Sequence, residues 1–125
     1  MTQQTARFLL VAQAALLLIG TLMPGAWRVA VQDASHSPIG LSSWAHFVLF
    51  AGLGAVASAP PLAWPWVRVV LATLGLALLS EGLQFFALDR HPRWLDVGID
   101  MSGVLTGVAL VQGMAWLKAG RVDRC

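Results

Sequence analysis

Residues 95–117 read LDVGIDMSGVLTGVALVQGMAWL, an apolar stretch in which Asp96 and Asp100 are the only charged residues. A helix that crosses the hydrocarbon core of a membrane needs roughly 20 predominantly apolar residues. The stretch meets that length, so it predicts a transmembrane helix with two carboxylates near its start.

The composition of the whole chain agrees with this prediction. Hydrophobic residues make up 58% of the 125 residues and charged residues only 11%, whereas a soluble domain carries about 25% charged residues. So little polar surface cannot cover a globule in water, and it indicates a chain whose solvent is lipid. The net charge of +2 is small, and no basic stripe with interleaved aromatics is present, so nucleic acid is not an expected partner.

Three further apolar stretches predict an all-α bundle of four transmembrane helices that forms a single domain. Proline and glycine punctuate the connections, as at Pro24-Gly25 and Pro60-Pro61. The six tryptophans lie near the ends of the stretches, where an interfacial aromatic belt places them. The predicted helices cover about residues 7–24, 43–59, 65–88 and 95–117.

An even number of spans places both termini on the same side of the membrane. Five basic residues fall on that side, namely Arg7, Arg68, Lys118, Arg121 and Arg124. Three fall on the opposite side, namely Arg28, Arg90 and Arg93. Because basic residues are enriched on the cytoplasmic side, this distribution favours cytoplasmic termini and a multi-pass protein of the cytoplasmic membrane.

The polar residues of the predicted spans gather in one leaflet. His46 follows the first connection, Glu81 and Gln84 precede the third, and Asp96 and Asp100 follow the third. The first and third connections face the same side in an alternating topology, which is the outer side if the termini are cytoplasmic. Glu81 and Gln84 share a helix face through their i,i+3 spacing, and Asp96 and Asp100 share one through i,i+4.

The fourth span also carries a packing motif. Gly103 and Gly107 form a G-x-x-x-G pattern, which lets another helix approach closely. The acidic start of this span is therefore expected to lie against a neighbouring helix. Ionisable residues at membrane depth are costly and usually face the bundle interior or a cavity, so Glu81 is expected to do the same.

The same polar residues resemble those of a known family. Residues 80–85 (SEGLQF) and the positions after them are similar to the second signature of VanZ-like membrane proteins, E-x-x-Q, then R, then D, then N-x-x-G. The positions that match are Glu81, Gln84, Arg90, Asp96, Asp100 and Gly103. His46-Phe47 is similar to the H-F of the family's first signature, and the resemblance covers about residues 16–110.

Two departures from the family pattern bear on function. Asp100 stands where the family usually has Asn, and Ser42 and Ser43 replace the acidic-basic pair that tends to precede H-F. The resemblance implies a bacterial envelope protein of the inner membrane, in a family named for a protein linked to resistance to the glycopeptide antibiotic teicoplanin. It does not imply a reaction, and the departures leave open whether the ligand is shared.

The sequence leaves three functional hypotheses open. The first is a recognition site for a lipid, a lipid-linked sugar or a cell-wall-directed antibiotic, formed by His46, Glu81, Gln84, Arg90, Asp96 and Asp100. The second is a membrane enzyme with Glu81 or Asp96 as general base and Arg90 holding an anionic group. The third is a structural subunit of a larger membrane complex or a homo-oligomer, in which these side chains only join helices. No close ligand spacing such as H-x-x-x-H is present, so neither a metal nor another cofactor is predicted.

Overall fold

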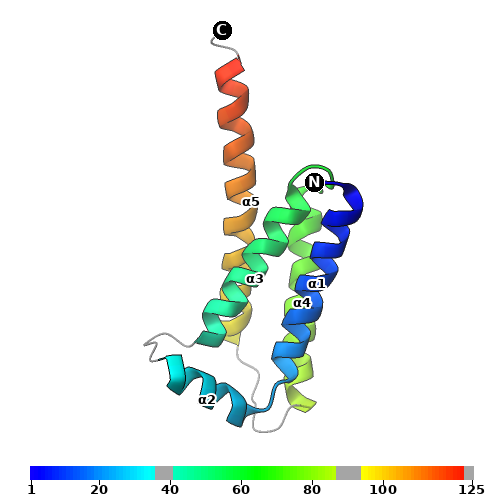
Figure 1. The fold of residues 1–125 in the computed structure, drawn as a ribbon. Helices are drawn as coiled ribbons and strands as arrows, with labels where there is room; N and C mark the ends of the chain where they lie inside the picture. The colour runs from blue at the N-terminus through cyan, green and yellow to red at the C-terminus, as the bar shows by residue number, and fades with distance from the viewer. Residues whose placement is uncertain (36–40, 87–93, 123–125) are drawn as a thin grey trace.

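Helices form every regular element among the residues that the computed structural model describes, 1–35, 41–86 and 94–122. The long helices are α1 (Gln3–Leu22), α3 (Leu41–Ser58), α4 (Trp66–Leu83) and α5 (Trp94–Val122). The short elements are α2 (Gly25–Ser35) and the 3₁₀ turn η1 (Gln84–Phe86), which continues α4. Successive long helices run in opposite directions, so α1 begins and α5 ends at the same end of the bundle, called here the terminal end (Figure 1). The opposite end, where α4 ends and α5 begins, is called the polar end.

Within the described residues, three helices are long and apolar enough to cross a membrane, as judged by length and composition. They cover Gln3–Leu22, Trp66–Phe86 and Trp94–Gly120. The described apolar part of α3, Ser43–Ser58, is shorter than the roughly 17 residues at the lower limit for a span. The prediction of an all-α chain is therefore confirmed for the described residues, and three of their helices qualify as candidate membrane spans, while a fourth span does not follow from these criteria.

The helix boundaries differ from those predicted where capping or helix propensity acts. α1 begins at Gln3 because the Thr2 hydroxyl accepts a hydrogen bond from the Thr5 amide at 3.1 Å and caps the first turn. α5 continues to Val122, beyond the predicted end at residue 117, since Lys118 and the residues after it include good helix formers. α4 ends at Leu83 and is followed by η1, which ends at Phe86. The last part of the predicted helix, residues 87 and 88, lies outside the described residues.

The sequence predicted no helix in the connection between the first two spans. The segment contains α2, which lies crosswise to the long helices at the polar end (Figure 1). The Trp27 amide donates to the Pro24 carbonyl at 3.1 Å and closes its first turn. Proline suits the start of a helix because its missing amide has no partner to lose there.

The burial pattern differs from that of a soluble bundle, although an apolar cluster that includes Leu17 and Phe50 is buried between the helices. Large apolar side chains face outward, with Phe8 71% exposed and Trp116 76% exposed. Polar side chains are buried between the helices, namely Thr21, His46, Thr73, Ser80, Glu81, Gln84 and Asp100. Water would solvate polar groups outside and drive apolar ones inside. An apolar surface around an interior that also holds polar side chains is what lipid as solvent favours.

The most extensive helix–helix interface joins α3 and α5. A Cβ at Gly103 would lie 2.5 Å from the carbonyl oxygen of Phe47, and one at Gly107 would collide with the backbone of Ala51. Only residues without a side chain let the two backbones approach this closely. The backbones of α3 and α5 therefore approach closely at the G-x-x-x-G motif, and this contact sets the register of α5 against α3.

Candidate polar binding site

The first half of the site is an imidazole–carboxylate pair that joins α3 to α5. His46 Nδ1 lies 3.1 Å from Asp100 Oδ1, and both side chains are buried. His46 also stacks on Phe50, one turn further along α3, with ring centroids 6.5 Å apart. When Asp100 is ionised, His46 Nδ1–H donates the hydrogen bond, which leaves Nε2 as an acceptor on the far side of the ring. Packing and hydrogen bond together hold this imidazole in one orientation.

The second half of the site lies where α4 tightens into η1. Gln84 Nε2 donates to Glu81 Oε1 at 2.7 Å, and both side chains are buried. The i,i+3 spacing predicted that these residues share a face, and the structure pairs them directly. One turn before Gln84, the Ser80 hydroxyl donates to the Ala77 carbonyl at 2.8 Å. Ser80 thereby satisfies its own polar group within α4.

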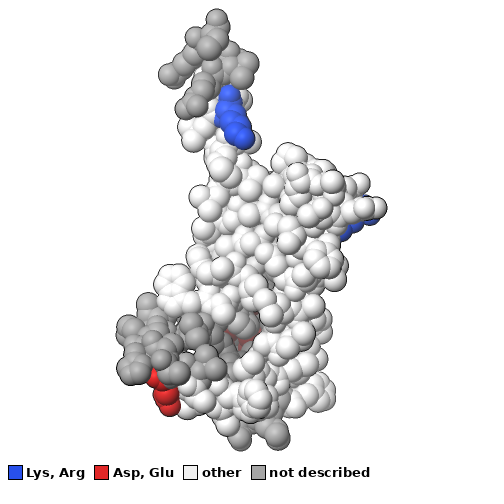
Figure 2. Space-filling model, viewed as in Figure 1, with Lys and Arg blue, Asp and Glu red and all other residues white. Residues whose placement is uncertain are grey.

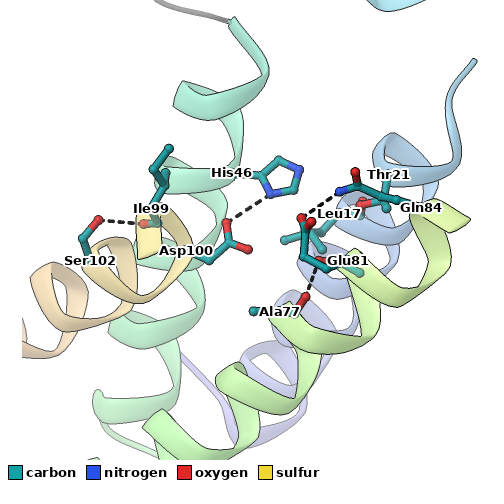
Figure 3. A network of polar contacts seen from close by, with 10 residues as sticks. Leu17, Thr21, His46, Ala77, Glu81, Gln84, Ile99, Asp100 and Ser102 are labelled. Carbon is teal, nitrogen blue, oxygen red and sulfur yellow. Dashed lines mark hydrogen bonds and ion pairs between the residues drawn. The ribbon is translucent and has the colours of Figure 1, made fainter. Parts of the chain in front are cut away.

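The two pairs face one another across the interior of the polar end (Figure 3). The second carboxylate oxygen of Asp100, Oδ2, is buried and has no hydrogen-bond partner among the described residues. Figure 3 shows it turned toward the side of the bundle that carries Glu81. Figure 2 shows acidic atoms recessed below the surface toward this end. Because buried polar atoms are nearly always hydrogen-bonded, an acceptor left open here is suited to a donor from outside the chain.

Sequence reasoning missed Thr21, which α1 contributes to the same region. Thr21 is fully buried, its hydroxyl donates to the Leu17 carbonyl at 2.9 Å, and it lies beside Gln84 (Figure 3). The available signal was a polar residue close to the first connection, in the leaflet of the other polar residues. That signal is weak, because threonine in a helix commonly bonds to the carbonyl four residues earlier.

Two of the six predicted ligand residues are not placed in the site. Asp96 lies one turn before Asp100, is only half-buried and has no hydrogen bond to a described side chain. Arg90 lies outside the described residues. His46, Glu81, Gln84 and Asp100 are the predicted residues that the fold brings together. Within the described ranges, no three His, Cys, Asp or Glu side chains are grouped so as to hold a metal ion.

Comparison with known proteins yields no match: no protein-family model, no curated protein and no solved structure is similar to the chain. The resemblance to VanZ-like proteins therefore stays a prediction that rests on the residues quoted above.

Proposed function

We propose that this chain is a VanZ-like, multi-pass protein of the bacterial cytoplasmic membrane whose polar site recognises a ligand of the cell envelope. The predicted ligands are a lipid, a lipid-linked sugar or a cell-wall-directed antibiotic. The observation that carries the proposal is the buried Asp100 Oδ2, an acceptor without a described partner that faces the space between two hydrogen-bonded pairs. A carboxylate oxygen at that depth is costly unless something donates to it, so a ligand that does so gains affinity.

The proposed topology has four spans, with α3 as the fourth, and both termini in the cytoplasm. α3 packs against α1, α4 and α5, so it occupies a central place in the bundle. Arg7, Arg68 and Lys118 lie toward the terminal end, whereas the described acidic residues lie toward the polar end, as the blue and red atoms of Figure 2 illustrate. α2, which contains Arg28, adds a basic residue at the polar end, and Arg90 and Arg93 lie outside the described residues. This distribution supports a cytoplasmic terminal end and therefore a polar site in the outer leaflet.

The chemistry of the described site favours ligands that donate hydrogen bonds. Asp100 and Glu81 are carboxylates, and His46 presents Nε2 as an acceptor when Nδ1 donates to Asp100. Hydroxyl groups complement such acceptors, whereas a bare phosphate would meet two carboxylates of like charge. Among the predicted ligands, a lipid-linked sugar fits best, because it combines hydroxyl donors with a chain that keeps it in the membrane.

Native mass spectrometry of the protein extracted in mild detergent tests this proposal. The wild type is compared with Asp100→Asn, which exchanges an acceptor oxygen for a donor, and with Glu81→Gln. Ser102→Ala is the matched control on α5, since the Ser102 hydroxyl is exposed and donates to Ile99 of its own helix at 2.7 Å. Circular dichroism and gel filtration establish that each variant is folded.

We expect a co-purified species in the wild type and in Ser102→Ala that is absent from folded Asp100→Asn and reduced in Glu81→Gln. The mass of that species identifies the ligand class. If no variant and no wild-type sample retains a ligand, and Glu81→Gln only unfolds more easily, the recognition hypothesis is wrong. The hypothesis of a structural subunit then accounts for the polar residues as contacts between helices.

A second candidate function is catalysis, and the His46–Asp100 pair is the observation that favours it. A carboxylate that accepts from one imidazole nitrogen orients the ring and leaves the other nitrogen as a general base. This geometry favours His46 over Asp96 as the base and leaves Glu81 as the second acid–base group. Incubation with a lipid-linked sugar would then give a product of different mass with the wild type and none with His46→Gln. Release of unchanged ligand by both proteins would favour binding alone.

A further inference from the structure

A second site of different chemistry lies toward the terminal end of the bundle. A cleft of about 200 Å³ separates α1 from α4, with α3 at its back. Val11 and Ala72 on its rim are exposed, whereas Leu53 and Val69 are buried, so the cleft opens on the outer surface of the bundle. Pockets that enclose a whole small-molecule ligand have volumes of roughly 300–1,000 Å³. This cleft therefore suits a segment of an extended molecule.

The lining of the cleft is apolar, and the hydroxyl of its one threonine is hydrogen-bonded within its own helix. Thr73 is its only residue with a polar side chain apart from Trp64, and the Thr73 hydroxyl donates to the Val69 carbonyl at 2.7 Å within its own helix. Trp64 is held at the cleft by its amide, which donates to the Ala57 carbonyl at the end of α3 at 2.9 Å. A hydrocarbon chain fits such a lining, since no buried side-chain polar atom of the lining residues lacks a hydrogen-bond partner.

Two arginines flank the cleft at the terminal end. The guanidinium carbon of Arg68 lies 4.3 Å from the centre of the Trp64 ring, so the cation is held over a residue that lines the cleft. Arg7 precedes Leu10 and Val11 by three and four residues, which places it on the face of α1 that borders the cleft. Both arginines are exposed, and the described acidic residues lie toward the opposite end. Stacking uses the face of the Arg68 guanidinium and leaves its in-plane N–H groups for an anion.

We propose that the cleft between α1 and α4 binds an anionic phospholipid, with one acyl chain against Trp64 and the phosphate held by Arg68 and Arg7. The charge of the arginines and the apolar lining of the cleft each match one part of that molecule. The inference shares only the membrane location with the proposed function, and none of its residues belongs to the polar site. Loss of phospholipid binding in the cleft can therefore be measured while ligand binding at the polar site is intact, and the reverse also holds.

The test adds defined lipids back to delipidated, full-length protein and counts the lipids retained in native mass spectra. Phosphatidylglycerol serves as the anionic lipid, and phosphatidylcholine with the same acyl chains serves as the zwitterionic comparison. Arg68→Gln and Arg7→Gln remove the proposed phosphate contacts, and Ala72→Phe fills the cleft from its exposed rim. Lys118→Gln is the matched control, because Lys118 is an exposed cation of α5 and does not line the cleft.

We expect the wild type and Lys118→Gln to retain phosphatidylglycerol in preference to phosphatidylcholine. Arg68→Gln should bind phosphatidylglycerol about ten-fold more weakly, the effect of losing one hydrogen bond to a charged group. Ala72→Phe should lose the bound lipid although both arginines remain. The proposal is overturned if Lys118→Gln weakens retention as much as Arg68→Gln, since that indicates unspecific attraction to charge. It is also overturned if Ala72→Phe retains lipid normally.

Discussion

Substitution of Gly107 by alanine tests the contact that determines how α5 lies against α3. A Cβ at this position would collide with the carbonyl oxygen of Ala51 and would lie 2.8 Å from the amide nitrogen of Ala55. Both are backbone atoms, which cannot rotate away as the end of a side chain could, so the two helices must separate. Overpacking of this kind costs about 1–3 kcal/mol. The better helix propensity of alanine offsets up to about 1 kcal/mol of that cost.

Gly113 provides a matched control six residues further along the same helix. A Cβ there would meet nothing within 4 Å, so Gly113→Ala changes helix propensity without changing packing. We therefore expect Gly107→Ala to be about 2 kcal/mol less stable than Gly113→Ala, when the free energy of unfolding is measured by titration of mixed micelles with a denaturing detergent. Tryptophan fluorescence and circular dichroism report the transition. Equal stability of the two variants would refute the close approach of α3 and α5.

The same substitution should also disturb the polar site. Asp100 lies two turns before Gly107 on α5, and its partner His46 lies on α3. Separation of the helices lengthens this hydrogen bond, so Gly107→Ala should lose the co-purified ligand that Gly113→Ala retains. Retention of the ligand by a destabilised Gly107→Ala would show that the polar pair does not depend on the contact at Gly107.

Three further predictions concern single polar contacts. His46→Ala leaves the Asp100 carboxylate buried without its partner and should lower the free energy of unfolding by about 3 kcal/mol. In a double-mutant cycle, the additional Asp100→Asn change should recover part of this loss. If the effects of the two substitutions simply add, the two side chains do not interact. Gln84→Leu removes the amide that donates to Glu81 and should cost about 1–3 kcal/mol in detergent titration, whereas a change within error would mean that this bond is replaced from elsewhere. Thr73→Val keeps the shape of the side chain and loses only a bond within α4, so retention of phosphatidylglycerol should match the wild type, and a clear loss would make the hydroxyl part of the lipid site.

Much of the fold could be predicted from composition and spacing alone. The charge deficit and the apolar stretches indicated a helical membrane chain. A segment that crosses a membrane needs an apolar surface, and a helix satisfies its backbone hydrogen bonds within the segment. α2 could not be found in this way, since eleven residues with mixed polarity give no span signal. For α3, apolar composition predicted a span, but the apolar part of the helix is shorter than the length that a span requires. A helix that packs against α1, α4 and α5 can be shorter than a span that faces lipid on its own.

The candidate site divides in a similar way. The i,i+3 pair Glu81 and Gln84 and the small-residue motif of α5 were predictable, because both depend on neighbours within one helix. The partnership of His46 with Asp100, 54 positions apart, was not predictable beyond a shared leaflet. It depends on the rotation and height of α5 against α3, which the contact at Gly103 and Gly107 determines.

The sequence by itself indicated helices that can cross a membrane, a shared end of the bundle for His46, Glu81, Gln84 and Asp100, and a close approach of α5 to another helix. These properties follow from composition and from the period of the helix, which act along one segment at a time. Only the tertiary structure decided which helix α5 approaches, that Asp100 turns one oxygen to His46 and leaves the other open, and that Arg68 stacks on Trp64 beside an apolar cleft. These properties depend on packing between segments distant in the chain, and helical spacing carries no information about that packing.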